Sequence, residues 1–531
     1  MVKTFNEMYI DFTKKVQDDN KTLLHFNDRK VNFREFTTRV EEIMRQLLRL
    51  GVREGTGIGY TLDNCIDILP LFIAASRLGA YTFPLFAGFP PSYKVTSYQR
   101  AFVSIIITNE KYAAGLKEAA KEIGYDVTIA VVDEHTEFES IYGDSKEGFD
   151  INDFIINPAR EDLPLLIGLS SGTTGIPKMV AMSQRNIGSE VIVMMDMDRH
   201  SQGILGLVGK EDKRMVAFPF STSVMLVVLG MMILGEVICY TDDMTIQNFL
   251  KQTQDCEANG ITCPPAFLES LLLLKDTHSY DLSKVVAIEG GMDFFSASLI
   301  RRTRELFPNL KVYGGGYGLV ETCNVYMFKI IDVVNEDVEQ TARYELSDMA
   351  ENVIRVCDED GNEVADGEIG EIYVKGPNVV AGYMETPHKL KEEFQDGWLR
   401  TGDIARKIND RVVSLMGREK FFIKRGGKSV SPIVVQAEIN KSEGVKDSAV
   451  VGVPHPLFGE MIWAFVVKKE GADVSLKEIK QTCKKGLPYY MMPDQVTFID
   501  DIPKKSGVGK VDFITIRKMG VEELNKTLSG K

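Results

Sequence analysis

The chain has 531 residues, of which 44% are hydrophobic and 26% are charged, and its formal net charge at pH 7 is -14. This length exceeds what one hydrophobic core usually organises, so we expect two or more domains, and the composition excludes a largely disordered chain. The acidic balance excludes general nucleic-acid binding, because affinity for phosphate backbones comes from concentrated lysine and arginine.

The seven cysteines are widely spaced and include no CxxC pair. This pattern fits neither a disulfide framework nor a zinc site, and it predicts a reducing, cytoplasmic environment. The first residues, MVKTFNEMYIDF, contain no apolar block of the signal-peptide kind, so we expect no export. The most apolar segment, Val224–Leu234, is too short to cross a bilayer and predicts a buried helix, not a membrane span.

Helical and strand-like segments alternate along much of the chain. Apolar residues recur at helical spacing in Val40–Leu50, whereas Ser104–Ile107 and Val127–Val132 are short and rich in β-branched residues. Repeated units of this kind predict an α/β fold with largely parallel sheets covered by helices, in which ligands bind at the carboxyl ends of strands. We therefore expect functional motifs in the loops that follow strands.

The pattern changes toward the C-terminal end. Beyond Gly367, the stretches GEIGEIYVKG and DRVVSLMG are short strand-like runs joined by tight turns, which predicts a β-rich subdomain at about residues 340–417. A mixed stretch of helices and strands follows, with a size that suits one domain. The sequence therefore predicts a core at 1–417, a boundary at 418–420 and a small α+β domain at 421–531.

The segment Gly168–Lys178, GLSSGTTGIPK, has the composition of a phosphate-binding loop. Its glycines allow backbone N–H groups to turn toward an anion, its hydroxyls donate further hydrogen bonds, and its lysine offsets phosphate charge. It differs from the P-loop of nucleotide triphosphatases, because Met179 follows the lysine where that motif needs serine or threonine. Composition alone leaves a solvated loop open as the alternative.

The order SSGTTGxPK within this loop resembles the signature of the adenylate-forming superfamily, which includes acyl-CoA synthetases, luciferases and nonribosomal-peptide adenylation domains. Further motifs extend the resemblance over nearly the whole chain. It implies a large core with a β-rich subdomain and a small mobile C-terminal domain. It also implies that a small carboxylic acid attacks Mg²⁺-ATP to give acyl-AMP and pyrophosphate, and that a thiol then accepts the acyl group.

The segment Tyr317–Glu321, YGLVE, resembles the YGxTE motif of the superfamily. The resemblance implies that Tyr317 stacks on adenine and that Glu321 holds Mg²⁺, a role that suits a carboxylate beside a triphosphate. Val320 replaces the usual threonine, so water or Thr322 would supply the missing hydroxyl. The residues implied to bind nucleotide are Ser170, Ser171, Gly172, Thr173, Thr174, Gly175, Lys178, Gly290, Gly291, Gly316, Tyr317, Gly318, Asp403 and Arg418.

The segment GWLRTGD ends at Asp403, which the resemblance assigns to the ribose hydroxyls together with Arg418. Lys420 stands at the position of the hinge about which the small domain would rotate between the two reactions. Gly426 and Gly427 lie in KRGGKSVSP, which resembles the loop that lines the tunnel for the thiol.

The segment Pro503–Asp512, PKKSGVGKVD, resembles the closing motif of the superfamily and places Lys510 at its catalytic lysine. An ammonium group between the carboxylate and the α-phosphate would stabilise the charge that develops as pyrophosphate leaves. The resemblance therefore implies that Lys510, Thr174 and Glu321 act in catalysis, with Glu321 as the metal ligand.

The segment Phe218–Val224, FPFSTSV, is expected to line the acyl pocket. Relatives that activate α-amino acids place an aspartate here to hold the ammonium group, and the serines and threonine of this chain disfavour such a substrate. Apolar neighbours favour an aromatic or medium-chain acid. The predicted pocket residues are Phe220, Ser221, Thr222, Ser223, Val224, Met225, Met292 and Gly315.

Two alternatives to an acyl-CoA ligase remain open at this point. A freestanding adenylation enzyme would load an acyl or aryl group onto the phosphopantetheine of a carrier protein, as in natural-product biosynthesis, and the sequence does not separate this acceptor from coenzyme A. An inactive nucleotide-binding sensor is suggested by Val320, Val434 and Gln436, which depart from the motifs. Lys510 disfavours the sensor, because binding alone has no need of a catalytic lysine.

Overall fold

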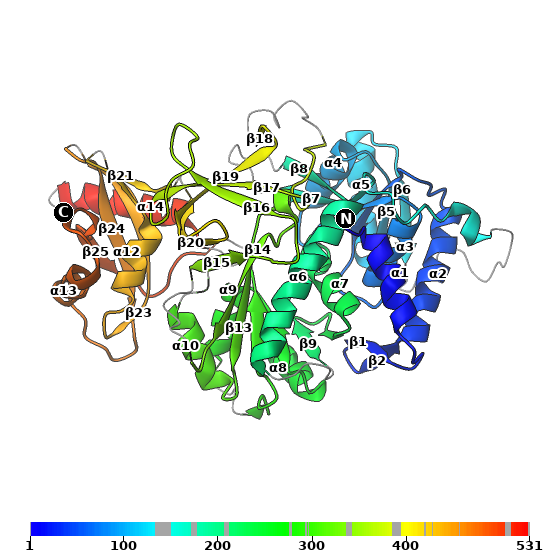
Figure 1. Cartoon of the computed structure of the whole chain (residues 1–531), viewed down its shortest axis with the longest axis horizontal. Coiled ribbons are helices and arrows are strands. Elements are labelled where there is room, and N and C mark those ends of the chain that lie inside the picture. Colours follow the sequence, from blue (N-terminus) through cyan, green and yellow to red (C-terminus); the bar gives the residue numbers. More distant parts are fainter. Residues whose placement is uncertain are drawn as a thin grey trace.

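The structure is a computed structural model that describes residues 2–132, 150–170, 178–205, 212–274, 279–291, 295, 297–335, 342–384, 394–418, 421–426, 428–455, 457–504 and 511–528. Within these residues, three sheets organise the chain. Figure 1 shows the N-terminal helices near one end of the long axis of the molecule and the C-terminal domain, coloured orange to red, at the other.

A six-stranded sheet in the order β6-β5-β3-β4-β7-β8 forms the N-terminal part of the core. Its strands are β3 (Gly57–Thr61), β4 (Tyr81–Pro84), β5 (Val103–Asn109), β6 (Thr128–Val132), β7 (Pro164–Ser170) and β8 (Lys178–Ser183). They run parallel except for β8, which is antiparallel to β7. The strands predicted at Ser104–Ile107 and Val127–Val132 are confirmed as β5 and β6. The pairing of β7 with β8 places Ser170 opposite Lys178, so the two ends of the phosphate-loop motif meet.

Helices accompany this sheet and pack their apolar faces into two hydrophobic clusters. They are α1 (Phe5–Lys15), α2 (Phe33–Arg49), α3 (Ile68–Arg77), α4 (Pro91–Arg100) and α5 (Glu110–Ile123), with a short turn η2 (Ile151–Phe154). The helix predicted at Val40–Leu50 is confirmed as part of α2. Its first turn is capped by Asn32, whose side chain accepts a hydrogen bond from the Glu35 N–H. Residues at helical spacing on α2 are buried, namely Phe36, Val40, Ile43 and Leu47.

A central sheet of fourteen strands continues the core. Its parallel strands are β1 (Thr22–Phe26), β9 (Lys213–Val216), β10 (Val237–Tyr240), β11 (Gly260–Thr262), β12 (Ala287–Gly290) and β13 (Val312–Tyr317), and β2 (Arg29–Asn32) pairs antiparallel with β1 at one edge. The connecting helices are α6 (Gln184–Leu205), α7 (Met225–Leu234), α8 (Ile246–Asp255), α9 (Pro265–Leu272) and α10 (Ala297–Leu306). Helix α7 confirms the predicted buried helix. In the described ranges, no helix combines the length and apolar character needed to cross a membrane.

The β-rich region extends this central sheet with antiparallel strands. These are β14 (Met327–Asp332), β15 (Arg343–Leu346), β16 (Val353–Cys357), β17 (Ile369–Lys375), β18 (Phe394–Gln395), β19 (Trp398–Lys407) and β20 (Val412–Arg418). Because β15 pairs with β14 as well as with β20, the subdomain predicted at about 340–417 is continuous with the parallel strands.

The last part of the chain forms a separate five-stranded sheet with its own helices. Its elements are β21 (Ile423–Arg425), β22 (Lys428–Val430), α12 (Pro432–Ile439), β23 (Val445–His455), β24 (Gly459–Lys468), α13 (Leu476–Gly486), η7 (Tyr489–Met491), β25 (Gln495–Phe498) and α14 (Phe513–Leu528). Two hydrophobic clusters belong to this part alone. The predicted α/β fold, with a large core of mixed sheets and a small α+β C-terminal domain, is therefore confirmed.

Candidate active site

A cavity of about 1590 Å³ lies at the ends of strands from both sheets of the core. Its lining includes residues of β7, β8, β12, β13, β19 and β20. The sequence-predicted residues that line it are Ser170, Lys178, Ser221, Thr222, Ser223, Val224, Gly290, Gly291, Gly316, Tyr317, Gly318, Glu321, Asp403 and Arg418. Motifs that are far apart in the sequence thus converge on one cavity.

One part of the lining carries three polar side chains in contact. The Tyr317 hydroxyl donates to Asp403 Oδ2 at 2.7 Å, and Arg418 Nε lies 2.9 Å from Asp403 Oδ1. Strand register explains the ion pair, because Asp403 in β19 lies opposite Arg418 in β20. Burial, followed by the charge of Asp403, raises the pKa of Tyr317 well above its ordinary value. The side chains of Tyr317 and Arg418 thus orient the Asp403 carboxylate. Because a carboxylate has about four acceptor positions, these two contacts are compatible with further hydrogen bonds from a ligand.

A second polar group is centred on Tyr383. Its hydroxyl donates to Glu321 Oε1 at 3.1 Å, and Lys178 Nζ lies 3.4 Å from the same hydroxyl and 4.5 Å from the ring centroid. Tyr383 reaches this position because its backbone pairs with Val180 in β8. The sequence analysis missed Tyr383, because no local sequence pattern predicts that it pairs with Val180, about two hundred residues earlier in the chain.

The short turn η4 (Val320–Thr322) presents Glu321 to the cavity. The Thr322 hydroxyl is buried, accepts from the Leu319 N–H at 2.8 Å and lies 3.1 Å from the Leu319 carbonyl oxygen. Thr322 therefore closes the turn, and the expectation that it could replace the missing threonine hydroxyl in the cavity does not hold. Gly318 is required beside this turn, because a Cβ there would lie 2.3 Å from the carbonyl oxygen of Asn324.

The loop at 218–224 supplies four of the predicted pocket residues, whereas three other predicted residues lie outside the cavity lining. Phe220 and Met225 are fully buried in the core, where Tyr60 Oη lies 3.2 Å from both the Phe220 carbonyl oxygen and Met225 Sδ. They pack under the loop and do not line the cavity. Gly315 is also absent from the lining, and a Cβ there would lie 2.8 Å from Lys329 Cε. The glycine makes room for a lysine, not for a substrate.

Of the remaining predicted residues, one lies in the C-terminal domain and the others are outside the part of the chain that the structure describes. Gly426 lies exposed in the C-terminal domain, where its N–H donates to the Phe458 carbonyl at 2.8 Å. Outside the described residues lie Ser171, Gly172, Thr173, Thr174, Gly175, Met292, Lys420, Gly427 and Lys510. The roles of Lys510 in catalysis, Lys420 as hinge and Gly427 in the thiol tunnel stay predictions.

The same cavity has an acidic part that sequence reasoning missed. Asp198 from α6, Glu236 from the turn before β10 and Glu289 from β12 all line it. Beneath them lies Arg214 of β9, which is 1% exposed, and Gly260 on β11 leaves room for its guanidinium. The signal was present in the sequence as single charged residues inside apolar runs, such as the glutamate in VVAIEGG.

Arg214 is paired with several carboxylates at once. Its Nε lies 2.9 Å from Glu236 Oε2, its Nη2 3.4 Å from Asp212 Oδ2 and its Nη1 3.6 Å from Glu289 Oε1. Burial raises the pKa of Glu236 to about 8, although Arg214 opposes this rise. Burial and then Glu289 raise the pKa of Asp198 to about 6. These carboxylates are therefore crowded and incompletely neutralised.

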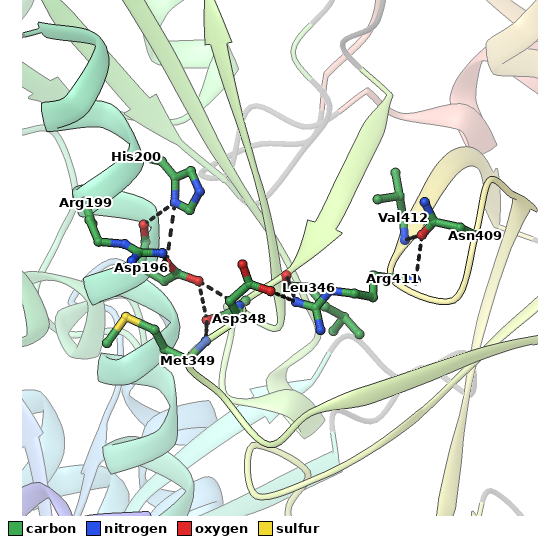
Figure 2. Close-up of polar contacts among 10 residues, drawn as sticks. Asp196, Arg199, His200, Leu346, Asp348, Met349, Asn409, Arg411 and Val412 are labelled. Carbon is green, nitrogen blue, oxygen red and sulfur yellow. Dashed lines mark hydrogen bonds and ion pairs between the residues drawn. The ribbon is translucent and has the colours of Figure 1, made fainter.

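Figure 2 shows how the part of α6 that carries this acidic group is anchored. Asp196 Oδ2 accepts hydrogen bonds from the Ser347 hydroxyl and the Asp348 N–H, each at 2.8 Å. Arg199 Nη2 lies 2.8 Å from Asp196 Oδ1. These contacts fix α6 to the segment after β15 and hence hold Asp198, two residues further along, in place.

The fold and the cavity together define a protein of the adenylate-forming superfamily. The family model described as AMP-binding enzyme matches residues 12–384, and the model of the AMP-binding enzyme C-terminal domain matches residues 435–510. The chain belongs to the AMP-binding enzyme family.

Relatives of the chain extend over nearly its full length. It is 28% identical to 4-coumarate–CoA ligase 2 of Solanum tuberosum over 91% of this chain and 88% of the relative. It is 25% identical to indoleacetate–CoA ligase of Aromatoleum aromaticum over 94% of this chain and 96% of the relative. Its structure resembles that of ATP-bound MatB from Rhodopseudomonas palustris, with a TM-score of 0.81 and 23% identity over 98% of this chain and 99% of the other. This last likeness shows a shared fold.

Proposed function

We propose that this protein uses ATP to activate a carboxylic acid as its acyl-adenylate and then transfers the acyl group to the thiol of coenzyme A. The observation that carries the proposal is the meeting of two polar groups in one cavity. Tyr317, Asp403 and Arg418 offer contacts for a ribose, and Lys178 with Glu321 offers contacts for phosphates. The cavity continues beyond them into space for an acyl group.

In this proposal each polar group has a defined task. Asp403 accepts hydrogen bonds from the ribose hydroxyls while Arg418 holds its carboxylate in an ion pair. Lys178 offsets phosphate charge and is steadied by Tyr383. The carboxylate of the acid attacks the α-phosphate, the bond to pyrophosphate breaks, and Lys510 would stabilise the charge that develops.

Glu321 fits the Mg²⁺ that would accompany ATP. One of its carboxylate oxygens accepts from Tyr383, and the side chain lines the cavity with a hard oxygen of the kind that Mg²⁺ prefers. When bound there with the triphosphate, the ion would neutralise charge during displacement at phosphorus. Tyr383 would hold Glu321 in position before and during this step.

Coenzyme A is proposed as the acceptor because two relatives that match nearly the whole chain are named as CoA ligases. The acyl group is proposed to be aromatic or of medium length. Apolar side chains support this, since Met194, Val227, Met231 and Leu234 line the same cavity.

The first test is ATP–pyrophosphate exchange across a panel of aromatic, short-chain and medium-chain acids, followed by release of the acyl group to coenzyme A. We expect exchange with one acid class and thioester formation with coenzyme A. Asp403→Asn should lower kcat/KM for ATP by about tenfold to a hundredfold through the loss of a charged hydrogen-bond acceptor. Asp366→Asn is the matched control, since that exposed carboxylate lies in the same region of the chain. Exchange that proceeds without transfer to coenzyme A would redirect the proposal to a carrier protein.

A further inference from the structure

The acidic part of the cavity has no task in the proposed adenylation step. Strand register separates Arg214 and Glu236 from the residues that have one, whereas Glu289 directly precedes Gly290 at the end of β12. Gly290 and Tyr317 end β12 and β13, whereas Arg214 lies near the start of β9 and Glu236 precedes β10. In a parallel arrangement the two sets are therefore at different levels of the sheet. An acyl group that is activated at the carboxyl ends of the strands would reach the acidic groups with its far end.

The carboxylates of this part have oxygens without a partner. Glu236 is 4% exposed and Glu289 5% exposed, and hydrogen bonds from the described residues reach only Oε2 of the first and Oε1 of the second. Asp198 Oδ1 is buried and has no hydrogen-bond partner in the described ranges. A buried oxygen without a partner, such as Asp198 Oδ1, costs free energy, and a hydrogen-bond donor bound beside it in the cavity would reduce that cost.

Negative charge in this part of the cavity would exceed positive charge if all of its carboxylates were ionised, and burial together with this crowding raises the pKa values of Glu236 and Asp198. Four carboxylates, those of Asp198, Asp212, Glu236 and Glu289, surround the single guanidinium of Arg214 among the described residues. A buried carboxylate is stable when it is paired with a cation and hydrogen-bonded. A ligand that enters the cavity with a positive charge would supply both the charge and the donors.

We propose that the acid activated by this protein carries an amine at the end remote from its carboxylate, and that Asp198, Glu236 and Glu289 bind this amine as an ammonium ion. The inference rests on the proposed function, because it names the substrate class of the same cavity. It also agrees with the loop at 218–224, which lacks a carboxylate for an α-amino group. The connecting part of the acid is hydrocarbon, since Met231, Leu234 and Phe267 line the same cavity.

The test compares acids that differ only in the distal group. ATP–pyrophosphate exchange is measured with ω-aminoalkanoates of increasing length and with para-(aminomethyl)benzoate. Each is paired with the isostere in which a methyl group replaces the amine, and para-(hydroxymethyl)benzoate serves as the neutral donor. We expect kcat/KM for the best amine to exceed that for its methyl isostere by at least about tenfold, because a desolvated charge pair discriminates strongly.

Two variants connect this preference to the acidic side chains. Glu236→Gln and Asp198→Asn keep the shapes of the side chains but cannot carry the negative charge that would pair with a bound ammonium ion. The amine-to-isostere ratio should therefore fall by about tenfold while exchange with the methyl isostere persists. Persistent exchange with the isostere shows that the variants are folded. Asp255→Asn removes an exposed carboxylate that pairs with Lys251 and should leave the ratio unchanged.

The outcomes are distinct for the two proposals. Adenylation of neutral acids with no preference for the amine, or with a preference for the hydroxymethyl compound, would overturn the ammonium site and leave the proposed function intact. A metal ion that co-purifies at one equivalent and is lost in Glu236→Gln would also overturn it. If ATP binds but no acid supports exchange, the proposed function fails and the ammonium site fails with it.

Discussion

Tyr383 illustrates how single side chains set the chemistry of this cavity. Its hydroxyl stands between Lys178 and Glu321, which come from different strands and turns, and it donates to the carboxylate while it accepts from the ammonium group. In the proposed function Lys178 and Glu321 both act on the phosphates, and without the tyrosine hydroxyl between them the two side chains could pair with each other. Tyr383 therefore holds the Lys178 ammonium group and the Glu321 carboxylate close together while leaving both able to contact a ligand in the cavity.

We expect Tyr383→Phe to lower kcat for pyrophosphate exchange by about tenfold, because the loss of one hydrogen bond to a charged group costs about 1.5 kcal/mol. KM for the acid should change little, since the hydroxyl contacts phosphate-side residues. Exchange kinetics at saturating ATP measure this effect. Tyr489→Phe is the control, because that ring is 83% exposed in the C-terminal domain. Equal kcat for wild type and Tyr383→Phe would remove Tyr383 from the site.

Glu236 should make the protein without substrate less stable as the pH rises from about 5 to 8. Its pKa is about 8 in the folded protein and near 4.5 in the unfolded chain, so between these values the folded state holds more protons. By linkage the free energy of unfolding then falls with rising pH, by up to about 1.4 kcal/mol per pH unit for one proton. Asp212, Glu289, Asp198 and Arg214 act on the same group.

The measurement is the thermal midpoint of wild type and Glu236→Gln across this pH range. The difference between the two midpoints should shift steadily with pH in favour of the glutamine variant, because glutamine does not titrate. A difference that stays constant from pH 5 to 8 would show that Glu236 is already ionised throughout.

Helix α6 shows how an element far from the nucleotide motifs can position a site. Its central part is held by Asp196, which is fully buried, and the contacts reach the segment after β15 and from there Arg411 next to β20, as Figure 2 shows. Movement of α6 would displace Asp198 and the Met194 side chain from the cavity wall. The anchor is therefore structural, and its effect on substrate choice is indirect.

Asp196→Ala should reduce the stability of the core by about 3 kcal/mol, because it removes a fully buried acceptor and leaves the buried Ser347 hydroxyl and the part-buried Asp348 N–H without it. Urea unfolding followed by tryptophan and far-UV signals measures the shift. Asp348→Ala provides the contrast within the same network. That side chain is 66% exposed and pairs with Arg411 at the surface, so its loss should cost less than about 1 kcal/mol. Similar costs for the two variants would show that burial does not decide the strength of this anchor.

The elements also show which features could be predicted from the sequence. Strands β5 and β6 and helices α2 and α7 follow from local spacing, and several residues of the cavity lining follow from motifs whose residue order is specific. Tyr383 and the carboxylates around Arg214 could not be predicted, because they meet through pairing and packing between distant segments. The sequence did not distinguish Phe220 and Met225, which lie in the core, from lining residues, because an apolar residue beside a pocket motif can face either the cavity or the core.

At the level of the whole molecule, the central sheet and the sheet of the C-terminal domain are connected by one short segment of the chain. The central sheet ends with β20 at Arg418, and the C-terminal sheet begins with β21 at Ile423. Any rotation of the C-terminal domain relative to the core must bend the chain between these residues, and the predicted hinge residue Lys420 lies in that interval. The proposed two-step reaction needs such a rotation, because one cavity would have to serve both the adenylation and the thiol transfer.

Lys420→Pro should separate the two reactions. Proline fixes φ near -65° and removes a donor, so it restricts rotation at this residue while the cavity of the core stays unchanged. Pyrophosphate exchange should then remain within about threefold of wild type, whereas thioester formation from the pre-formed adenylate should slow by more than about tenfold. Lys420→Ala removes the side chain but keeps a flexible backbone, so it should retain both steps. If proline slows both reactions equally, the residue contributes to the fold and not to a domain rotation; if it slows neither, the bend between Arg418 and Ile423 is made elsewhere.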